Sequence, residues 1–283
     1  MRLVTFETGD GPERVGSMRS RGEIDELEAP DMLVWLGGSG RHTTGAKHRL
    51  DDVRLLAPVP FPTSVRDFSA YEGHVRAGFQ RRGAEVPDAW YEAPVFYFSN
   101  PAAVFGPDQA VRRPASTRML DFELEIAAVI GAEEEIAGFA LLNDWSARDV
   151  QGREMTVGLG PAKGKDFATS LGPWLVTPDE LPYDGERLEL EATAAVNGRI
   201  VARASAKAMH FSWPELVAQA ARDTRLRVGD VLGSGTLTGG SLLDIGTLDG
   251  RWIEPGDEVV LSAPGLGELR TPVVGCRSFE RPG

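Results

Sequence analysis

The chain has 283 residues, enough for one large domain or for a large domain with a small one. Its composition is that of an ordinary globular protein, and its net charge of -12 argues against nucleic-acid binding and against a basic membrane-binding surface. The only cysteine, Cys276, allows no internal disulfide. The first residues lack the apolar segment of a signal peptide, and no apolar run approaches the roughly 20 residues of a membrane span. We therefore expect a cytoplasmic protein.

The first part of the chain is mixed and rich in turns, and nothing in it indicates catalytic chemistry. It ends at "LAPVPFPTS", in which Pro58, Pro60 and Pro62 occupy alternate positions. Prolines with this spacing favour an extended segment and forbid a helix. We expect a small N-terminal domain over residues 1–57, packed on a larger domain over residues 58–283.

After this boundary the sequence predicts more strands than helices. The segment "SVRDFSAYEGHVRAGF" (64–79) has apolar residues at roughly helical spacing and predicts one or two short helical turns. The result is a β-rich α+β protein. The other predicted elements are strands over 103–131, a hairpin over 187–206 that turns at Asn197-Gly198, a helix over 212–226 with a capping box of Ser212 and Glu215, and strands at 227–232 and 257–262.

Acidic residues alternate in "MLDFELEIAAVIG" (119–131), where Asp121, Glu123 and Glu125 share one face of a predicted strand. Such a face is either exposed to solvent or directed at a cation. Two features favour the cation. A nearly continuous apolar run follows Glu125, as in a buried strand, and a further acid, Asp144, follows an apolar segment in "LLNDWSARDVQ". A set of carboxylates suits Mg²⁺ or Ca²⁺ better than zinc.

Other polar residues are open to two interpretations. In "RDFSAYEGHVRAGF", Asp67 and His74 are either a helix-start acid and a surface histidine or, taken together, a metal ligand and a general base. Arg148 and Lys165, taken singly, are ordinary surface charges. The segment "GSGTLTGG" matches neither a dinucleotide-binding nor a phosphate-binding loop, so it is a flexible turn or a carboxylate site formed by backbone amides and Thr236.

Four segments, in this order, resemble the catalytic domain of the fumarylacetoacetate hydrolase family: "DFELEIAAVIG", "GFALLNDWSARDVQ", "GKDFATSLGPWLVT" and "GTLTGG". The resemblance runs from about residue 60 to the end, and "RDFSAYEGHV" with "APVFYFSNPAAVFG" resembles the fumarylacetoacetase branch. The first 56 residues show no such resemblance. The resemblance implies a mixed β-roll or β-sandwich catalytic domain behind a small N-terminal domain, in a homodimer.

The resemblance also implies roles for particular residues. It places a divalent metal, Mg²⁺ or else Ca²⁺ or Mn²⁺, on Asp67, Glu123, Glu125 and Asp144. It places the base on His74, oriented by Asp244 where the branch has a Glu, and the groups that hold the reacting oxygens on Arg148, Gln151 and Lys165. It places substrate contacts on Tyr97, on Thr236 and, with a spacing that differs by one residue, on Arg82.

Some positions fall outside this set. Asp121 is expected at the rim of the site or behind the metal ligands, and Glu72 is a weaker local candidate for the base. Ser69 and Met155 stand where the branch has substrate-contacting tyrosines, so the substrate of that branch is not carried over to this chain.

The residue types indicate how such a site would work on a small oxo or diketo acid. Breaking a C–C bond beside a ketone requires a stabilised carbanion, which a divalent metal chelated by two substrate oxygens provides as an enolate. His74 would deprotonate the attacking water, and Lys165, Arg148 and Gln151 would stabilise the oxyanion. We expect a metal-dependent hydrolase of a β-diketo acid or acylpyruvate.

Three alternatives remain open. The same enolate serves a decarboxylase, isomerase or hydratase of a 2-oxo acid. A catalytically silent metal- or ligand-binding homologue would need the acids at most. A carbohydrate-binding β-sandwich with structural Ca²⁺ is conceivable from the six Trp, but Trp145 and Trp174 lie inside the motif segments, which favours packing roles.

Overall fold

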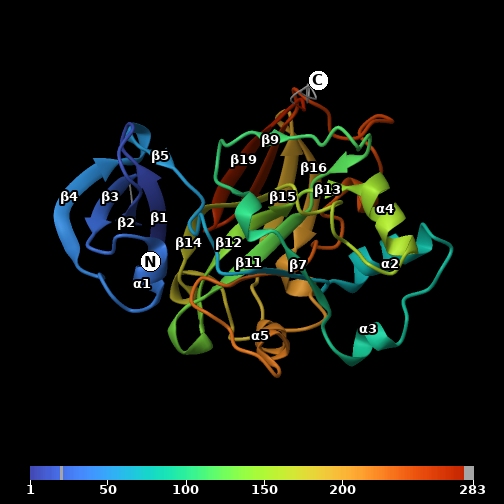
Figure 1. The fold of residues 1–283 in the computed structure, drawn as a ribbon, viewed down its shortest axis with the longest axis horizontal. Helices are drawn as coiled ribbons and strands as arrows, with labels where there is room; N and C mark the ends of the chain where they lie inside the picture. The colour runs from blue at the N-terminus through green and yellow to red at the C-terminus, as the bar shows by residue number, and fades with distance from the viewer. Residues whose placement is uncertain (20–21, 277–283) are drawn as a thin grey trace, which may run out of the picture.

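The computed structural model describes residues 1–19 and 22–276. Figure 1 shows a small N-terminal unit, drawn in blue, beside a larger unit. The N-terminal unit is a meander of antiparallel strands with one short helix, which begins after Asp31, whose carboxylate accepts the Val34 N–H at 2.9 Å. Its elements are β1 (Arg2–Glu7), β2 (Arg14–Met18), β3 (Glu23–Leu27), α1 (Met32–Leu36), β4 (Thr43–Arg49) and β5 (Arg54–Leu55).

The N-terminal strands continue the main sheet of the larger unit, because β1 pairs antiparallel with β14, where Leu3 lies opposite Leu175. The main sheet runs in the order β4-β3-β2-β1-β14-β12-β11-β17-β6-β7 and mixes parallel and antiparallel pairs. The predicted boundary at residue 57 lies in the irregular segment between β5 and β6. The strands that the larger unit contributes are β6 (Val65–Phe68), β7 (Phe96–Ser99), β8 (Val104–Phe105), β11 (Leu124–Ile130), β12 (Ile136–Asp144), β14 (Thr169–Val176) and β17 (Val231–Gly233).

A second sheet, in the order β16-β15-β18-β19-β9, packs against the main sheet. The predicted hairpin is confirmed: Val196 pairs with Arg199 across a turn in which Asn197 and Gly198 have φ of 52° and 77°, as a type I′ turn requires. The remaining strands are β9 (Val111–Arg112), β15 (Glu191–Val196), β16 (Arg199–Ser205), β18 (Glu258–Ala263) and β19 (Gly267–Val274), with a separate pair β10 (Leu120–Asp121) and β13 (Ser146–Ala147).

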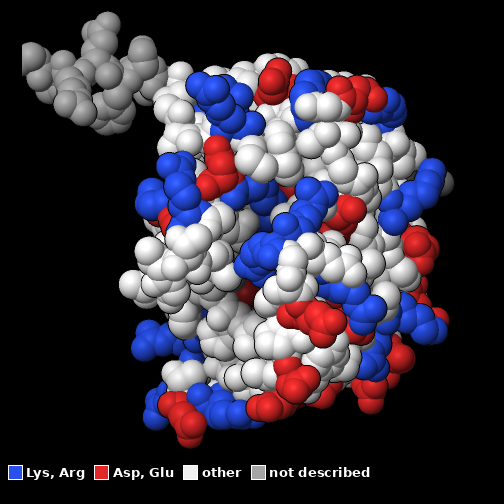
Figure 2. All heavy atoms as spheres, turned by 90° about the vertical axis from the view of Figure 1, so that its right-hand side faces the viewer, with Lys and Arg blue, Asp and Glu red and all other residues white. Residues whose placement is uncertain are grey.

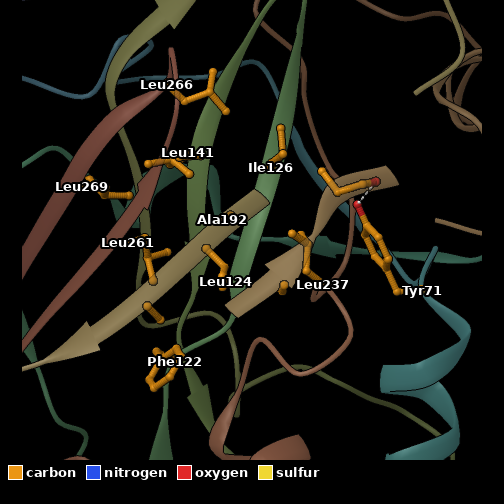
Figure 3. Packing of buried hydrophobic residues seen from close by; sticks show 14 of the residues in the cluster. Tyr71, Phe122, Leu124, Ile126, Leu141, Ala192, Leu237, Leu261, Leu266 and Leu269 are labelled. Carbon is orange, nitrogen blue, oxygen red and sulfur yellow. Dashed lines mark hydrogen bonds between the residues drawn. The ribbon is translucent and has the colours of Figure 1, made fainter. Parts of the chain in front are cut away.

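Both faces of β11 are buried. Leu124 and Ile126 point into the core between the two sheets, where Figure 3 shows them beside Leu261 and Leu269 from the second sheet. On the opposite face, Ala127 and Val129 pack in a second core that includes N-terminal residues such as Leu3 and Trp35. The acids that alternate with Leu124 therefore lie on a buried face, and the solvent-exposed interpretation of that face is wrong. The fold is strand-rich α+β, as the sequence predicts.

The predicted helical stretch over 64–79 is wrong in its first half. Asp67 lies on strand β6, because Val65–Phe68 pairs with β17 on one side and β7 on the other. Ser64 does not cap a helix; its hydroxyl donates to Asp230 at 2.8 Å. Only the second half is helical. The helices of the larger unit are α2 (Glu72–Gln80), α3 (Ala89–Glu92), α4 (Arg148–Thr156), α5 (Trp213–Ala221) and α6 (Leu242–Ile245).

The predicted capping box of α5 is confirmed: the Ser212 N–H donates to the Glu215 carboxylate at 2.7 Å. Trp145 is fully buried and donates to Ser170 at 2.9 Å, so it packs rather than binds a ligand. Among residues 1–19 and 22–276, no helix is long and apolar enough to cross a membrane. Single 3₁₀ turns lie at Leu50–Asp52, Pro101–Ala103, Ala132–Glu134, Pro178–Glu180 and Ala206–Ala208.

Candidate active site

Four carboxylates from three segments of the chain meet in the main sheet. Asp67 lies on β6, Glu125 on β11 and Asp144 at the end of β12, and Glu123 directly precedes β11. Each offers one carboxylate oxygen, and these oxygens all lie within 4.8 Å of one another. All four side chains are buried. These four residues, here called the acidic cluster, are the set that the sequence predicts as metal ligands.

Strand β17 sets the distance between two of these acids. It lies between β6 and β11, and its Gly233 pairs with Asp67 on one side and Ala127 on the other. A Cβ atom at Gly233 would lie 2.2 Å from Asp67 Oδ1 and 3.1 Å from Glu125 Oε2, so only glycine leaves room for both carboxylates. Gly235 then donates its N–H to the same two side chains, at 3.3 and 3.2 Å. The amide of this Gly-rich segment thus faces the protein's own acids.

Lys165 lies buried among the acids and donates to Glu123 and Asp144. Burial alone would lower the pKa of Lys165, but the two carboxylates outweigh burial and raise the pKa above its usual range, so the ammonium stays charged. Burial alone would raise the pKa of Glu123, but the positive charges of Arg148 and Lys165 outweigh it and lower the pKa. Glu123 is therefore a carboxylate held between cations.

The rest of the acidic cluster is short of positive charge. Burial, followed by repulsion from Asp67 and Glu123, raises the pKa of Glu125 well above its usual range. Burial raises the pKa of Asp144 as well, despite Lys165, and its Oδ1 is buried without a hydrogen-bond partner in the described part of the chain. A divalent cation would supply the missing charge and take that oxygen as a ligand, and an all-oxygen set suits Mg²⁺, Ca²⁺ or Mn²⁺. The residues present therefore fit a hard divalent cation.

A histidine–aspartate pair faces the acidic cluster. His74, on α2, places Nδ1 2.8 Å from Asp244 Oδ1, on α6, and Gly239 N–H donates to the other oxygen of Asp244 at 2.9 Å. His74 Nε2 lies 3.5 Å from Glu123 Oε1. The Asp side chain is thus long enough to hold the imidazole, although the family branch has a Glu at this position. The free edge of the imidazole points towards the acids, where a general base could take a proton from a bound water.

A cavity of about 480 Å³ opens over the acidic cluster. Its outer wall is apolar and includes Phe79, Trp90, Val95, Phe96 and Met155. Figure 2 views the side of the molecule that carries α2 and α4, and shows Lys and Arg side chains gathered near the middle of that face beside a hollow. The predicted site residues that line the cavity are Asp67, His74, Arg82, Tyr97, Glu123, Glu125, Gln151, Lys165 and Thr236.

Arg148 lies behind this lining and faces protein groups. Its NH2 atom lies 2.8 Å from Asp121 Oδ2 and 2.7 Å from Glu123 Oε1, and its NH1 atom donates to Gln151 Oε1 at 3.2 Å. Asp121 is fully buried, so of the two places expected for it, it lies behind the acidic cluster and not at the rim.

The remaining predicted residues differ in how directly they face the cavity. The Tyr97 hydroxyl donates to Asp144, and the Thr236 hydroxyl donates to Glu125 Oε1 at 3.4 Å. Arg82 is exposed, with its guanidinium 4.5 Å from the centre of the Phe79 ring.

Glu72, the weaker candidate for the base, lies outside the lining and bonds with Arg76 and with the Tyr91 hydroxyl at 2.7 Å.

The sequence did not predict the apolar wall of the cavity or the role of Gly233. The only signal for the latter was the "GSG" spacing, which looked like a ligand-binding turn.

A strand-rich scaffold that brings a buried carboxylate cluster and a histidine–aspartate pair to one cavity defines a class of candidate metalloenzyme. Residues 63–274 match the model of the fumarylacetoacetate (FAA) hydrolase C-terminal family, and residues 1–58 match a Rv2993c-like N-terminal family. The chain belongs to the fumarylacetoacetate hydrolase family, and the N-terminal part, whose sequence carries none of the motifs of that family's catalytic domain, matches a second family.

Similar proteins differ in the reactions that their names describe. The chain is 31% identical to fumarylacetoacetase of Oryza sativa subsp. japonica over 77% of this chain and 67% of that protein. It is 29% identical to oxaloacetate tautomerase YisK of Bacillus subtilis over 95% of this chain and 89% of that protein. The crystal structure of a 5-carboxymethyl-2-hydroxymuconate delta-isomerase from Mycobacterium smegmatis superposes with a TM-score of 0.74 at 29% identity, over 98% of this chain and all of that one.

Proposed function

We propose that the chain is a divalent-metal-dependent hydrolase that cleaves a C–C bond in a small β-diketo acid or acylpyruvate. The observation that carries this proposal is the pair of His74 and Asp244, joined at 2.8 Å, whose imidazole faces the acidic cluster. A hydrolase needs a base beside the water that attacks the substrate, and this pair has the geometry of such a base.

The metal ligands in this proposal are the four residues of the acidic cluster, and Mg²⁺ is the first candidate, with Ca²⁺ or Mn²⁺ as alternatives. When bound, the cation would supply a Lewis acid that stabilises the negative charge on the oxygens of a ketone. The raised pKa of Glu125 and Asp144, caused first by burial, supports a site that requires added positive charge.

The chain's own residues then divide the remaining work. Neutral His74 takes a proton from water at Nε2, while Asp244 accepts the Nδ1–H, fixes the tautomer and stabilises the imidazolium that forms. Lys165 and Gln151 line the cavity and donate to the developing oxyanion. Arg148, which forms ion pairs with Asp121 and Glu123, holds those carboxylates in place from behind.

Substrate contacts fall on the outer part of the cavity. Tyr97 and Thr236 lie next to the acids that they bond, and Arg82 is the cation at the mouth that a substrate carboxylate would meet. Positive side chains gathered on this face would attract an anionic substrate even though the whole chain carries a charge of -12.

The second candidate is an isomerase, tautomerase, decarboxylase or hydratase of a 2-oxo acid on the same site. The similarity to oxaloacetate tautomerase favours it, because that match spans 95% of this chain and includes the N-terminal unit, whereas the match to the rice fumarylacetoacetase spans 77%. In this case His74 would move a proton on the substrate carbon instead of activating water.

Product analysis separates the two candidates. The protein is incubated with acylpyruvates and with oxaloacetate in D₂O, with and without EDTA, and the products are followed by NMR. Hydrolysis releases two fragments, one of which carries a new carboxylate. Release of CO₂, addition of water without cleavage, or deuterium exchange without a new fragment carboxylate favours the second candidate. Turnover that continues in EDTA would contradict the metal site for both. We further propose that the protein is a cytoplasmic homodimer. Light scattering would test the dimer, because it measures the mass in solution, and fractionation of cells would test the location.

A further inference from the structure

Asp121 neither lines the cavity nor belongs to the acidic cluster, yet it is fully buried and accepts several hydrogen bonds. Its Oδ1 accepts the Leu242 N–H at 2.9 Å, and its Oδ2 accepts the Leu243 N–H at 3.0 Å and Arg148 Nε at 2.8 Å. A buried carboxylate that accepts charge-assisted and backbone hydrogen bonds on both oxygens is fixed in position. These hydrogen bonds connect Asp121 to both parts of the site, the acidic cluster and the histidine–aspartate pair.

The first set of contacts leads to the acidic cluster. The Arg148 NH2 atom lies 2.8 Å from Asp121 Oδ2 and 2.7 Å from Glu123 Oε1. A guanidinium is a rigid, planar fork, so the position of Asp121 determines where Arg148 can hold Glu123. Asp121 thus acts on the acidic cluster without belonging to it.

The second set of contacts leads to the histidine. Leu242 and Leu243 form the first turn of α6, and Asp244 follows directly on the same helix. Because Asp121 holds this turn by two backbone N–H groups, it places Asp244, which in turn holds His74 at 2.8 Å.

The two sets of contacts close into a ring, because His74 Nε2 lies 3.5 Å from Glu123 Oε1. Through the ring, Asp121 is joined to Arg148 and Glu123 on one side and, through α6, to Asp244 and His74 on the other. A base works only when it lies within reach of the group that it deprotonates, so a shared anchor for the base and the acidic cluster fixes the distance that matters.

We propose that Asp121 is a positioning residue that sets the location of Glu123 through Arg148 and the location of His74 through α6 and Asp244. The inference rests on the proposed function for the roles of Glu123 and His74, but the ring of contacts does not depend on which reaction the site performs. A residue of this kind touches neither substrate nor cation and acts on both through its neighbours.

The test of the first half is Mn²⁺ binding to the Asp121→Asn protein, measured by calorimetry. The asparagine side chain has the shape of the aspartate side chain and keeps one oxygen that can accept from the N–H groups of α6. It lacks the negative charge that holds Arg148. We expect the Mn²⁺ dissociation constant to rise by about 10–100-fold, as it does when a residue that supports a metal ligand is lost. The matched control is Asp257→Asn.

Asp257 is a suitable control because it is also a buried carboxylate that pairs with an arginine, Arg251, at 2.6 Å and accepts a backbone N–H, that of Glu254, at 2.8 Å. It has no contact with the acidic cluster or with α6 among its hydrogen bonds and ion pairs in the described residues. Asp257→Asn should bind Mn²⁺ as the wild type does.

The test of the second half uses the histidine signal itself. In protein labelled with ¹⁵N-histidine, the His74 resonances are identified by their loss in His74→Gln and are followed without metal. Asp121→Ala removes the acceptor of both α6 N–H groups, and we expect it to shift the His74 resonances, whereas Asp257→Asn leaves them in place. If Asp121→Ala does not fold, Asp121→Ser serves in its place, because its single short hydroxyl cannot accept both N–H groups.

Arg148→Lys tests the ring from the other side. It keeps the charge but loses the fork that spans Asp121 and Glu123, and we expect weaker Mn²⁺ binding with the His74 resonances nearer to those of the wild type than in Asp121→Ala.

Two results would overturn the inference: a folded Asp121→Asn protein with wild-type Mn²⁺ affinity, or unmoved His74 resonances when the Asp121 carboxylate is removed. A wild-type protein that binds no Mn²⁺ would instead contradict the proposed metal site, and the histidine signal would still decide the second half of the inference.

Discussion

The acidic cluster and the histidine–aspartate pair face one cavity, but the chain builds them in different ways. The acids lie on or directly beside strands of the main sheet, and their positions follow from its register, as Gly233 opposite Asp67 illustrates. The pair lies on two short helices, α2 and α6, that meet outside that sheet, and the His74 side chain is 18% exposed while that of Glu123 is 4% exposed.

The two parts of the site therefore suit two different tasks: the acidic cluster suits binding of a cation, and the histidine–aspartate pair suits proton transfer. A cluster of buried carboxylates fixes charge and the place of a cation, whichever reaction follows. A base on a more exposed helix decides whether a proton is taken from water or from the substrate. Relatives whose names describe a hydrolase, a tautomerase and an isomerase fit this division, since similar proteins with one fold carry different reactions.

The largest effect is expected in the acidic cluster. Glu125→Gln removes one negative charge at the oxygen that faces Gly235 N–H and Asp67, and the carboxamide is a poorer ligand for a hard cation. We expect Mn²⁺ affinity to fall by more than the ~10–100-fold seen when only a supporting residue is lost, and turnover to fall to background. Calorimetry and a product assay measure the two quantities. Wild-type metal affinity in Glu125→Gln would remove Glu125 from the ligand set.

A smaller effect, confined to chemistry, is expected on the other side of the cavity. His74→Ala should lower kcat for acylpyruvate hydrolysis by about 10²–10⁴-fold, the usual contribution of a general base, and leave Mn²⁺ affinity near that of the wild type. His42→Ala, at an exposed position of the N-terminal unit, is the control. Hydrolysis by His74→Ala at the wild-type rate would refute the proposed base. Loss of metal binding in His74→Ala would mean that metal binding by the acidic cluster depends on the histidine–aspartate pair.

The same division explains what the sequence could predict. Alternation along a strand is a local pattern, and the apolar run after Glu125 and the position of Asp144 favoured a buried face directed at a cation; the full ligand set, with Asp67, came from the family resemblance. The hairpin at Asn197-Gly198 and the capping box at Ser212 could be predicted because each depends on residues that are close in sequence.

Features that depend on distant segments could not be predicted. The periodicity over 64–79 mixed a strand with a helix, because Asp67 is extended through pairing with β7 and with β17, and β17 lies more than 160 residues away along the chain. The room that Gly233 leaves for Asp67 depends on the same pairing. The family resemblance implied that Arg148 holds the reacting oxygens. The contacts of its guanidinium with Asp121 and Glu123 depend on how α4 lies beside β10, which no local sequence pattern indicates.

A third prediction probes how tightly the sheet sets the acidic cluster. In Gly233→Ala, the added Cβ would lie 2.2 Å from Asp67 Oδ1, so the carboxylate or the strand must shift. We expect a loss of about 1–3 kcal/mol in the free energy of unfolding from overpacking, and roughly tenfold weaker Mn²⁺ binding from the displaced acid. Denaturant unfolding and calorimetry measure these quantities.

The matched control for that change is Gly78→Ala on α2, where a Cβ meets nothing within 4 Å. A glycine-to-alanine change in a helix with open space is expected to raise the free energy of unfolding by about 0.4–1 kcal/mol and to leave Mn²⁺ affinity unchanged. Equal effects of the two substitutions would contradict a site set by the spacing of β6, β17 and β11.

The smallest effect is the contribution of Glu125 and Asp144 to the dependence of stability on pH. Burial first, and then repulsion between the acids, raises the folded-state pKa of Glu125 and Asp144 above the values of an unfolded chain. The protonated forms therefore favour folding: their contribution to stability is fully present below the unfolded pKa and is lost as pH rises through the raised folded pKa. The metal-free protein should thus become less stable as pH rises through this window.

A bound divalent cation offsets the repulsion that appears when these acids ionise, and protons compete with it at low pH. The gain in Tm on adding Mg²⁺ should therefore grow from mildly acidic to mildly alkaline buffer, when melting in Mg²⁺ is compared with melting in EDTA. His74→Ala should keep this dependence, because it leaves the acids in place, whereas Glu125→Gln should reduce it. A gain in Tm that stays constant with pH would mean that Lys165 and Arg148 already neutralise the negative charge of the acidic cluster. A bound cation would then have no uncompensated carboxylate charge to neutralise.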